Sequence, residues 1–346
     1  MKRISPRLLI ALSCCLFITA GAFAQRGGRS QGESLVVKIA SPLPKASPWG
    51  RTLDRLAGEW SRITNGQVRL NVRHDGIEGG EGKMLISLSS NTIQAAVFTS
   101  FGLSSISPEV MTMSAPFLIR NKEELDTVMA ALQDDLEARI NRTDYCIVAW
   151  SKSGFVNVFS KDPVFVPDDL RRQKIATNAD ATDLNTAFKS MGFQLVETDL
   201  VDVGTKLATG NIMAAYQNPA GVAAYHLHNY LNHMLSVNIA PILGGIIINQ
   251  VTWKKIGELN PQYQREILRV TRLVAAELDA SMQKTVNDAI LSMRRGGLKV
   301  NQPTPAQEQL WFDDVERIIP GLLGTTFDRD IYNKINTILS RYRNRR

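Results

Sequence analysis

The chain has 346 residues, of which 44% are hydrophobic and 21% are charged, and its 40 lysines and arginines exceed its 33 acidic residues by seven. This length is enough for two domains, each with its own packed core. The cations form no basic stripe interleaved with aromatic residues, so the positive charge gives nucleic-acid binding no support.

The N-terminal segment, Met1–Ala24, has a basic start, an apolar middle and a small-residue ending, A-F-A. This pattern is typical of a secretory signal that is cut after Ala24, so we expect a periplasmic protein. A retained anchor and a lipoprotein cut at Cys14 or Cys15 remain the alternatives. Both are less favoured, because the apolar stretch is shorter than a membrane span and little of it precedes either cysteine.

The next residues, 25–33, are rich in Gly, Arg and Ser and predict a flexible spacer. Without residues 1–24, the surplus of cations falls to four, and Cys146 is the single cysteine left. A chain of this kind has no internal disulfide and depends on its apolar core. Cys146 lies in the apolar stretch DYCIVAWS, which favours an inert buried thiol over a nucleophile.

From residue 34 onward, apolar runs typical of strands alternate with helical patterns. A buried strand is predicted over 35–41, and the following helix has an apolar face that includes Trp49 and Trp60 and ends at Asn65-Gly66. Further predicted elements are a strand over 67–73, a helix over 81–90, a strand over 93–98 and a helix over 122–140. This order predicts an α/β fold with a mainly parallel sheet.

Two apolar strands, 145–151 and 154–160, follow in close succession. They are divided by Lys152–Ser153, where we place a crossing between two domains. Small α/β units then repeat over residues 160–240, including helices over 181–191, 201–209 and 219–229. The apolar run over 244–250 predicts a strand that returns to the first sheet.

The longest predicted element is one helix over residues 261–295. It contains no Pro or Gly after Pro261, and its apolar residues recur at steps of three or four. At 1.5 Å per residue it is roughly 50 Å long, so we expect it to span two domains. A last helix is predicted over about 326–341. The basic tail, residues 341–346, favours a frayed, solvated end over a partner contact.

Catalytic and metal-binding motifs find little support in the sequence. The glycine-rich stretch GIEGGEGKML holds Ile77 and Met84 where a phosphate-binding loop needs Gly and Ser or Thr. His226, His228 and His233 have no acid or cysteine at a ligand-like spacing, and two histidines two positions apart in a helix face apart. An enzyme, a hydrolase included, is therefore disfavoured. A protein that binds a small ligand between two lobes is the better interpretation.

Five segments, in order along the chain, resemble the solute receptors of TRAP transporters (tripartite ATP-independent periplasmic transporters, the DctP-like family). The resemblance runs from about Val36 to about Leu339. The segments are KIASPLPKASPWG, ITNGQVRLNVRHDGIEGGEGKML, GLSSISPEVMTMSAPFLIRNKEEL, SKDPVFVPDDLRRQKIAT and KLATGNIMAAYQNP.

This resemblance implies a two-lobed periplasmic binding protein of the α/β class, with mixed, mainly parallel sheets, hinge strands and one long helix across both lobes. We expect lobe I over 34–153 and 242–282, and lobe II over 154–241 and 297–340. The implied function is to bind a small organic solute, usually an organic acid, and to deliver it to TRAP membrane subunits that an ion gradient drives. It implies no catalysis and no cofactor.

The sequence departs from the family at three polar positions. The arginine that clamps the ligand carboxylate is replaced by Ala176, a second arginine by Val156, and an acid by Met213. An arginine fork makes bidentate hydrogen bonds that lysine does not replace. Lys174 is expected on the same strand face as Ala176 and could supply a cation without the fork. We therefore expect an atypical, more apolar ligand in a hydrophobic cleft.

The candidate ligand residues combine this apolar set with four polar orienting groups, Thr99, Asn178, Gln217 and Asn218. The alternative is that the apolar members are core residues and that the site lies elsewhere. The full set is Trp49, Phe98, Thr99, Phe101, Val156, Lys174, Ala176, Asn178, Met213, Tyr216, Gln217 and Asn218.

A second function hypothesis is a scaffold that has kept the receptor fold and lost solute binding. Loss of the arginines is compatible with it. Some TRAP receptors pair with a tetratricopeptide-repeat protein, so the resemblance leaves such a partner open for this chain, with the apolar cleft and the basic tail as its contacts.

Overall fold

The computed structural model describes residues 34–177, 182–199 and 202–345. The predicted signal peptide and spacer therefore lie outside the described residues, as does Asn178. The strands are β1 Leu35–Ala40, β2 Val68–Arg73, β3 Ala95–Thr99, β4 Tyr145–Ser160, β5 Lys174–Thr177, β6 Gln194–Glu197, β7 Ala214–Gln217, β8 His233–Leu235, β9 Ala240–Asn249 and β10 Lys299–Asn301.

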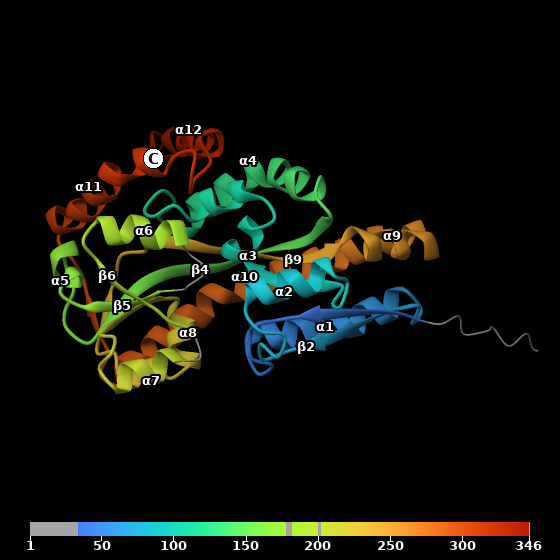
Figure 1. Cartoon of the computed structure of the whole chain (residues 1–346), viewed down its shortest axis with the longest axis horizontal. Coiled ribbons are helices and arrows are strands. Elements are labelled where there is room, and N and C mark those ends of the chain that lie inside the picture. Colours follow the sequence, from blue (N-terminus) through green and yellow to red (C-terminus); the bar gives the residue numbers. More distant parts are fainter. Residues whose placement is uncertain (1–33, 178–181, 200–201, 346) are drawn as a thin grey trace, which may run out of the picture. The chain divides into compact units, whose positions relative to one another are not determined.

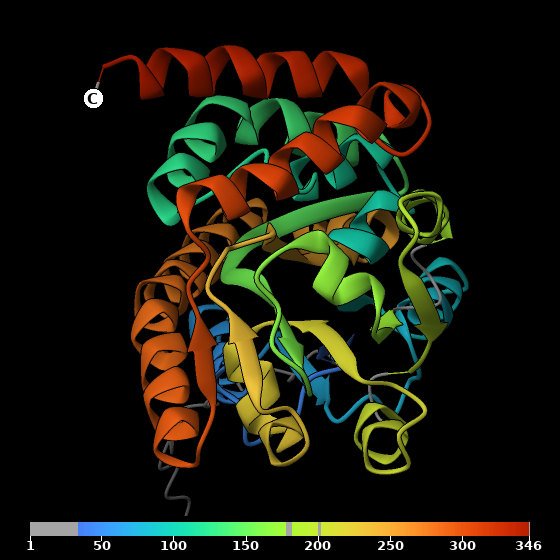
Figure 2. The ribbon, with the colours of Figure 1, turned by 90° about the vertical axis from the view of Figure 1, so that its left-hand side faces the viewer.

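The helices pack on both faces of the strands (Figure 1). Figure 2 shows α12 lying over α4, two helices that are far apart in the sequence but in contact. The helices are α1 Pro48–Ile63, α2 Glu81–Ser89, α3 Ser100–Ser104, η1 Pro108–Ser114, α4 Lys122–Asn141, α5 Pro167–Arg171, α6 Thr182–Ser190, α7 Val203–Ala208, α8 Pro219–Ala224, η3 Leu227–Asn229, α9 Gln250–Leu259, α10 Pro261–Arg295, α11 Pro305–Leu322 and α12 Arg329–Arg343.

All described strands belong to one ten-stranded sheet, with the order β2-β1-β3-β9-β4-β7-β5-β6 and with β8 and β10 beside this path. Pairs within β1–β3 and within β5–β7 are parallel, whereas β9 and β4 pair antiparallel with their neighbours. We call the part built on β1, β2 and β3 the first half and the part built on β5, β6 and β7 the second half. The mixed, two-half α/β architecture predicted from the sequence is confirmed.

Helix α1 shows why the sequence forms its elements where it does. The Ser47 side chain accepts a hydrogen bond from the Gly50 amide, and Pro48 occupies the first helical position, where its missing N–H costs nothing. Its buried face includes Trp49 and Trp60. The chain then leaves the helix through Asn65 and Gly66, which have positive φ angles of 51° and 77°.

Strand β4 connects the two halves of the sheet. The sequence predicts two strands here, but the structure has one, Tyr145–Ser160, with register shifts at Ile147/Ala149 and at Lys152/Phe155. The polar residues that suggested a break form the second bulge. The prediction of two strands was wrong because an extra residue in a bulge bends a strand without ending it.

The apolar residues form three clusters, which lie on the two faces of the sheet. The shared core includes Phe98 of the first half and Val158 and Ile175 of the second half, and α4, α11 and α12 cover it. The other face has two separate clusters. The α1 core contains Val37, Leu53, Trp60, Ile248 and Leu278, and the α7 core contains Phe159, Ala176, Leu207, Ala215 and Met293.

Helix α10 runs along both separate clusters, as its predicted length required. Val274, Leu278 and Met282 belong to the α1 core, and Met293 belongs to the α7 core. None of the helices in the described part of the chain is both long and apolar enough to cross a membrane.

The C-terminal helix corrects the prediction of a frayed basic tail. Helix α12 continues to Arg343, whose guanidinium donates to both carboxylate oxygens of Glu124 at 2.8 Å. Glu124 is buried on α4, so this arginine anchors the end of the chain. The same contact joins α12 to a helix that the sequence assigned to lobe I. The exact lobe boundaries stay a prediction.

The helix predicted over 219–229 is shorter than expected. Helix α8 ends at Ala224, and His226 adopts a left-handed conformation with φ 54° before the short turn η3. The rings of His226 and His228 therefore lie 6.0 Å apart instead of facing apart. Among the described residues, no three His, Cys, Asp or Glu side chains are placed to hold a metal ion.

Candidate functional site

Two of the predicted ligand residues meet at the bulge of β4. The indole Nε1 of Trp49 donates to Ser153 Oγ at 3.2 Å. From the second half, Asn218 Nδ2 donates to the carbonyls of Ser153 at 3.0 Å and Phe155 at 3.2 Å. The bulge, Lys152–Phe155, thus joins the start of α1 to the turn between β7 and α8. We call these contacts the crossover site.

Glycine is required at the centre of the crossover site. Gly154 has a φ of 94°, which L side chains rarely adopt. A Cβ atom at this position would lie 3.1 Å from Asn218 Nδ2 and 3.6 Å from Val286 Cγ2. A side chain here would be strained and would push against the amide that bonds to β4.

Asp279 of α10 completes the crossover site, although no sequence motif indicates it. Its Oδ1 accepts from the Lys152 amide at 2.9 Å and from Ser151 Oγ at 3.2 Å. Burial raises the pKa of Asp279, although these two hydrogen bonds and the Lys152 charge act in the opposite direction. The Lys152 ammonium pairs with Asp126 of α4.

A second group of predicted residues lies where β3 passes into α3. Glu81, at the start of α2, accepts from the amide of Thr99 at 2.9 Å, from Thr99 Oγ1 at 3.1 Å and from the amide of Gly102 at 2.6 Å. Thr99 Oγ1 also caps α3 by accepting from the Phe101 amide at 3.3 Å. Thr99 and Phe101 are half-buried, and the carboxylate that holds them was missed by the sequence analysis.

Most of the apolar candidates lie in the cores or pack against them. Phe98 and Val156 are buried in the shared core, and Tyr216 packs against it. Burial raises the pKa of the Tyr216 phenol. Ala176 is buried in the α7 core on the opposite face of the sheet. These positions agree with the alternative that the apolar members are core residues.

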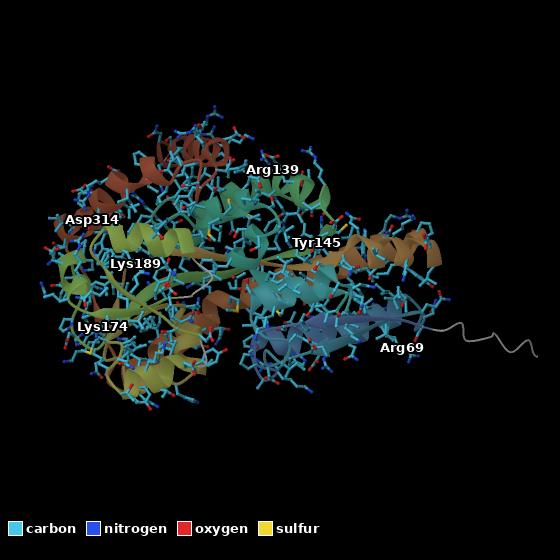
Figure 3. All side chains as sticks on the ribbon, in the orientation of Figure 1. Arg69, Arg139, Tyr145, Lys174, Lys189 and Asp314 are labelled. Carbon is cyan, nitrogen blue, oxygen red and sulfur yellow. The ribbon has the colours of Figure 1, made fainter. Side chains whose placement is uncertain are left out.

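Lys174 and Met213 lie at the start of β5 and β7, at the opposite end of these strands from Gln217 and Asn218. Lys174 begins β5 and Met213 precedes β7, and the Met213 amide donates to the Lys174 carbonyl at 2.7 Å. Gln217 ends the parallel strand β7, four residues after Met213, so it lies roughly 13 Å away along the strand direction. Lys174 is exposed, and Figure 3 places it at the side of the second half that is turned away from α1.

The two arginines before β5 are bound to acids. Arg171 pairs with Asp168 at 2.5 Å and with Asp314 of α11, which Figure 3 labels on the outer side of the second half. Arg172 pairs with Asp169 at 2.5 Å. Arg171 therefore fastens α5 to α11, whereas the pair of Arg172 lies within α5 and its C-cap.

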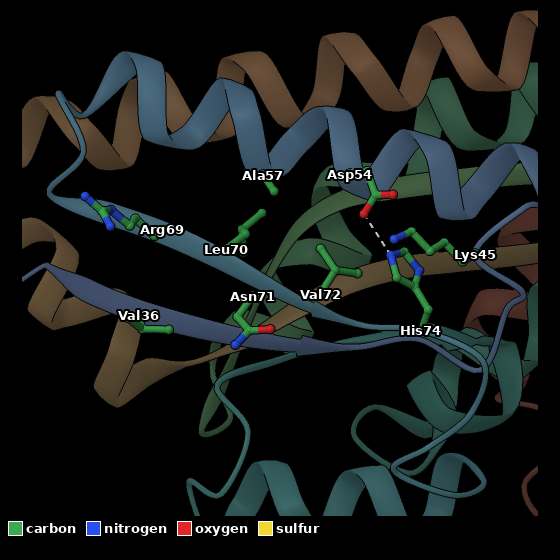
Figure 4. A pocket seen from close by; sticks show the side chains of 9 residues that line it. All are labelled: Val36, Lys45, Asp54, Ala57, Arg69, Leu70, Asn71, Val72 and His74. Atoms are coloured by element: carbon green, nitrogen blue, oxygen red, sulfur yellow. Dashed lines mark hydrogen bonds and ion pairs between the residues drawn. The ribbon is translucent and has the colours of Figure 1, made fainter.

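A pocket of about 430 Å³ lies elsewhere, between α1 and the edge strand β2 (Figure 4). Inside it His74 Nε2 is hydrogen-bonded to Asp54 Oδ1 at 2.8 Å. None of the candidate ligand residues lines it. The lining residues are Val36, Lys45, Asp54, Ala57, Arg69, Leu70, Asn71, Val72 and His74.

Cys146 is buried in β4, and burial raises the pKa of its thiol to about 11. At neutral pH it is therefore a thiol and not a thiolate nucleophile. This supports the interpretation from the sequence.

Comparison with known proteins decides the family. The profile of a family described as "Bacterial extracellular solute-binding protein, family 7", DctP, matches residues 39–322. The chain belongs to the DctP family. Among DctP relatives, the 2,3-diketo-L-gulonate-binding periplasmic protein YiaO of Escherichia coli K12 is 26% identical over 210 residues, which are 59% of this chain and 62% of YiaO.

Solved structures with the DctP fold superpose over nearly their whole length. A TRAP periplasmic solute-binding protein of Chromohalobacter salexigens with bound D-glucuronate has a TM-score of 0.78, at 18% identity, over 87% of this chain and 99% of its own. A second, from Shewanella oneidensis with bound succinate, has a TM-score of 0.80, at 15% identity, over 88% and 99%. At these identities the likeness establishes the fold.

Proposed function

We propose that this chain is the periplasmic solute receptor of a TRAP-type transporter and that it captures a small organic solute between the two halves of the sheet. The observation that carries the proposal is the DctP fold with β4 and β9 running between the halves. Receptors of this architecture bind their ligand at such a crossing and close around it. The partners are the TRAP membrane subunits, and the chain itself is not an enzyme.

The solute is held without an arginine fork from β4 or β5. Val156 and Ala176, at the positions of the family arginines, are buried apolar residues. The two arginines that precede β5 are engaged by Asp168, Asp314 and Asp169. The related structures contain the acids D-glucuronate and succinate. We expect the solute of this chain to be of similar size and more apolar.

Gln217 is the polar group best placed to orient such a solute. It is half-buried at the carboxyl end of β7, beside the crossover site, and its Oε1 accepts from the Asn218 amide at 2.8 Å. Its amide nitrogen donates to none of the described residues. A ligand carbonyl or hydroxyl would give this nitrogen a partner.

Titration calorimetry with succinate and D-glucuronate tests the ligand chemistry. We expect dissociation constants weaker than about 1 mM for both acids. The Lys174→Ala variant should give the same result, because Lys174 is exposed at the other edge of the sheet. Tight succinate binding that persists in Lys174→Ala would contradict the proposed apolar ligand while leaving the receptor function intact.

The second candidate function is a receptor-fold scaffold that has lost solute binding. The burial of Ala176 in the α7 core favours it, since the position of the family arginine then offers no charged group to a solute. Native mass spectrometry of gently purified protein separates the two functions. A small molecule that co-purifies supports the receptor, and a second polypeptide, such as a tetratricopeptide-repeat protein, supports the scaffold.

A further inference from the structure

The face of the sheet covered by α10 has no continuous apolar packing between the two halves. Met282 of α10 lies in the α1 core and Met293 lies in the α7 core. Near this boundary, Asp279 of α10 makes hydrogen bonds to β4. Val286, two turns further along the helix, lies beside Gly154.

The bulge creates the need for this polar contact. A bulge leaves backbone groups of one strand without a partner in the sheet, and a buried N–H without an acceptor is unfavourable. The register between β4 and β9 shifts from Lys152 to Phe155, and the Lys152 amide donates to Asp279 at 2.9 Å. A carboxylate makes this a charge-assisted hydrogen bond.

The contact extends from Asp279 to both halves. Ser151 Oγ lies 3.2 Å from Asp279 Oδ1 and 2.9 Å from Ser153 Oγ, which accepts from the Trp49 indole. On the other side of the bulge, Asn218 bonds to the Ser153 carbonyl at 3.0 Å. Rotation of one half against the other at the bulge must therefore change at least one of these hydrogen bonds.

We propose that Asp279 is the positioning residue of the hinge: it fixes the bulge of β4 on α10 and so sets the angle between the two halves. It acts through Lys152 and Ser151 and does not need to touch the solute. The inference goes beyond the proposed function, because it concerns the unliganded protein.

Hydrogen–deuterium exchange of the unliganded protein tests the proposal. Asp279→Ala removes the acceptor, and we expect the Lys152 amide to exchange at least about tenfold faster, while α4 and α12 keep their protection. Asp279→Asn keeps an acceptor oxygen and should exchange within about threefold of the wild type. The matched control is Glu277→Ala, which removes an ion pair between α10 and Arg55 of α1 within the first half.

Small-angle X-ray scattering of the same variants measures the angle between the halves. We expect Asp279→Ala to broaden the distribution of interatomic distances, whereas Asp279→Asn and Glu277→Ala should match the wild type. Unchanged exchange at Lys152 and an unchanged distribution in Asp279→Ala would overturn the proposal. So would equal changes in Asp279→Ala and Glu277→Ala, since these would reflect a general loosening of α10.

A milder variant covers the case in which Asp279→Ala does not fold. Ser151→Ala removes one of the two donors to Asp279 and keeps the Lys152 amide bond. We expect a smaller increase in Lys152 exchange in the same direction. No increase in this variant would then overturn the proposal. Because no solute is needed, failure here leaves the receptor function untouched, and failure of solute binding leaves the hinge result untouched.

Discussion

The two faces of the sheet are packed in different ways. On one face, the shared core includes residues of both halves, and α4, α11 and α12 cover it without interruption. On the other face, the α1 core and the α7 core are separate, and α10 runs along both. Apolar packing is non-directional and depends on buried area, whereas a few hydrogen bonds fix one geometry.

This difference indicates where the molecule can change shape. Disturbing the shared core affects both halves at once, because close-packed interiors transmit strain. On the α10 face, movement of one half against the other must change the hydrogen bonds of the crossover site. We therefore expect stability to depend on the shared core and the relative position of the halves to depend on the crossover site.

The largest effects should come from phenylalanines in the two kinds of core. Phe98 of the shared core and Phe159 of the α7 core are at most 1% exposed, and replacing either by alanine should cost about 3–5 kcal/mol in urea unfolding. Hydrogen exchange separates them: Phe98→Ala should lower protection in both halves, and Phe159→Ala chiefly in the second half. Identical exchange patterns in the two variants would contradict the conclusion that the two faces of the sheet are packed differently.

Glu124→Gln tests the ion pair between Glu124 of α4 and Arg343 of α12, two helices that cover the shared core. It should lower the free energy of unfolding by about 1.5–3 kcal/mol at neutral pH. Burial alone would raise the pKa of Glu124, but hydrogen bonds from Arg343 and from the Arg120 amide, with their charges, lower it. A lowered pKa contributes stability above the ordinary value of 4.5, and this is lost as the pH falls through the folded-state pKa. The difference between wild type and variant should therefore vanish in acid. Arg341→Ala, an exposed change on the same helix, should stay within about 0.5 kcal/mol of the wild type.

Trp49→Phe compares a hydrogen bond at the crossover site with one inside a core. Phenylalanine keeps an aromatic ring but lacks the N–H that donates to Ser153. The free energy of unfolding should therefore fall by about 0.5–1.5 kcal/mol. Trp60→Phe is the control, because it removes an equivalent bond to Thr271 at 2.9 Å within the α1 core. Exchange at residues 153–155 should rise in Trp49→Phe only. If both variants raise the exchange at residues 153–155, the hydrogen bonds of the crossover site do not act independently of the α1 core.

The smallest effect is expected for the pH dependence of Asp279→Asn. Burial raises the pKa of Asp279, so the folded protein loses stability as the pH rises from about 3.8 through the raised folded-state pKa. The charged groups that contribute to this shift, apart from Asp279 itself, are Lys152 and Asp126. The neutral variant avoids this loss, and its melting temperature at pH 7 should be higher by no more than about 2 °C. The gain should disappear in acid, and a gain that grows as the pH falls would contradict the assignment.

The sequence predicts those elements whose pattern is long and regular. Helix α10 and the buried face of α1 follow from apolar spacing alone. The single strand β4 could not be predicted, because a bulge is visible only from the register against β9, which lies some ninety residues further along the chain. The anchoring of Arg343 was missed for a similar reason, since Glu124 is 219 positions away.

The candidate site was predictable in part. Trp49 and Asn218 were placed near the ligand region, and the structure brings both to the bulge of β4. Their partner Ser153 and the carboxylate of Asp279 depend on the path of β4 and α10, which no local motif encodes. Strand alternation predicts that Lys174 shares a face with Ala176, but it cannot predict where along the strand the ligand region lies.

The position of β9 in the sheet has a consequence for how the protein folds. Strand β3 has β1 on one side and β9 on the other, and β9 follows it by more than a hundred residues. The first half therefore cannot complete its sheet until most of the chain has been made. Such long-range pairing slows folding, because the entropy lost in closing a loop of this length must be overcome before the strands can pair.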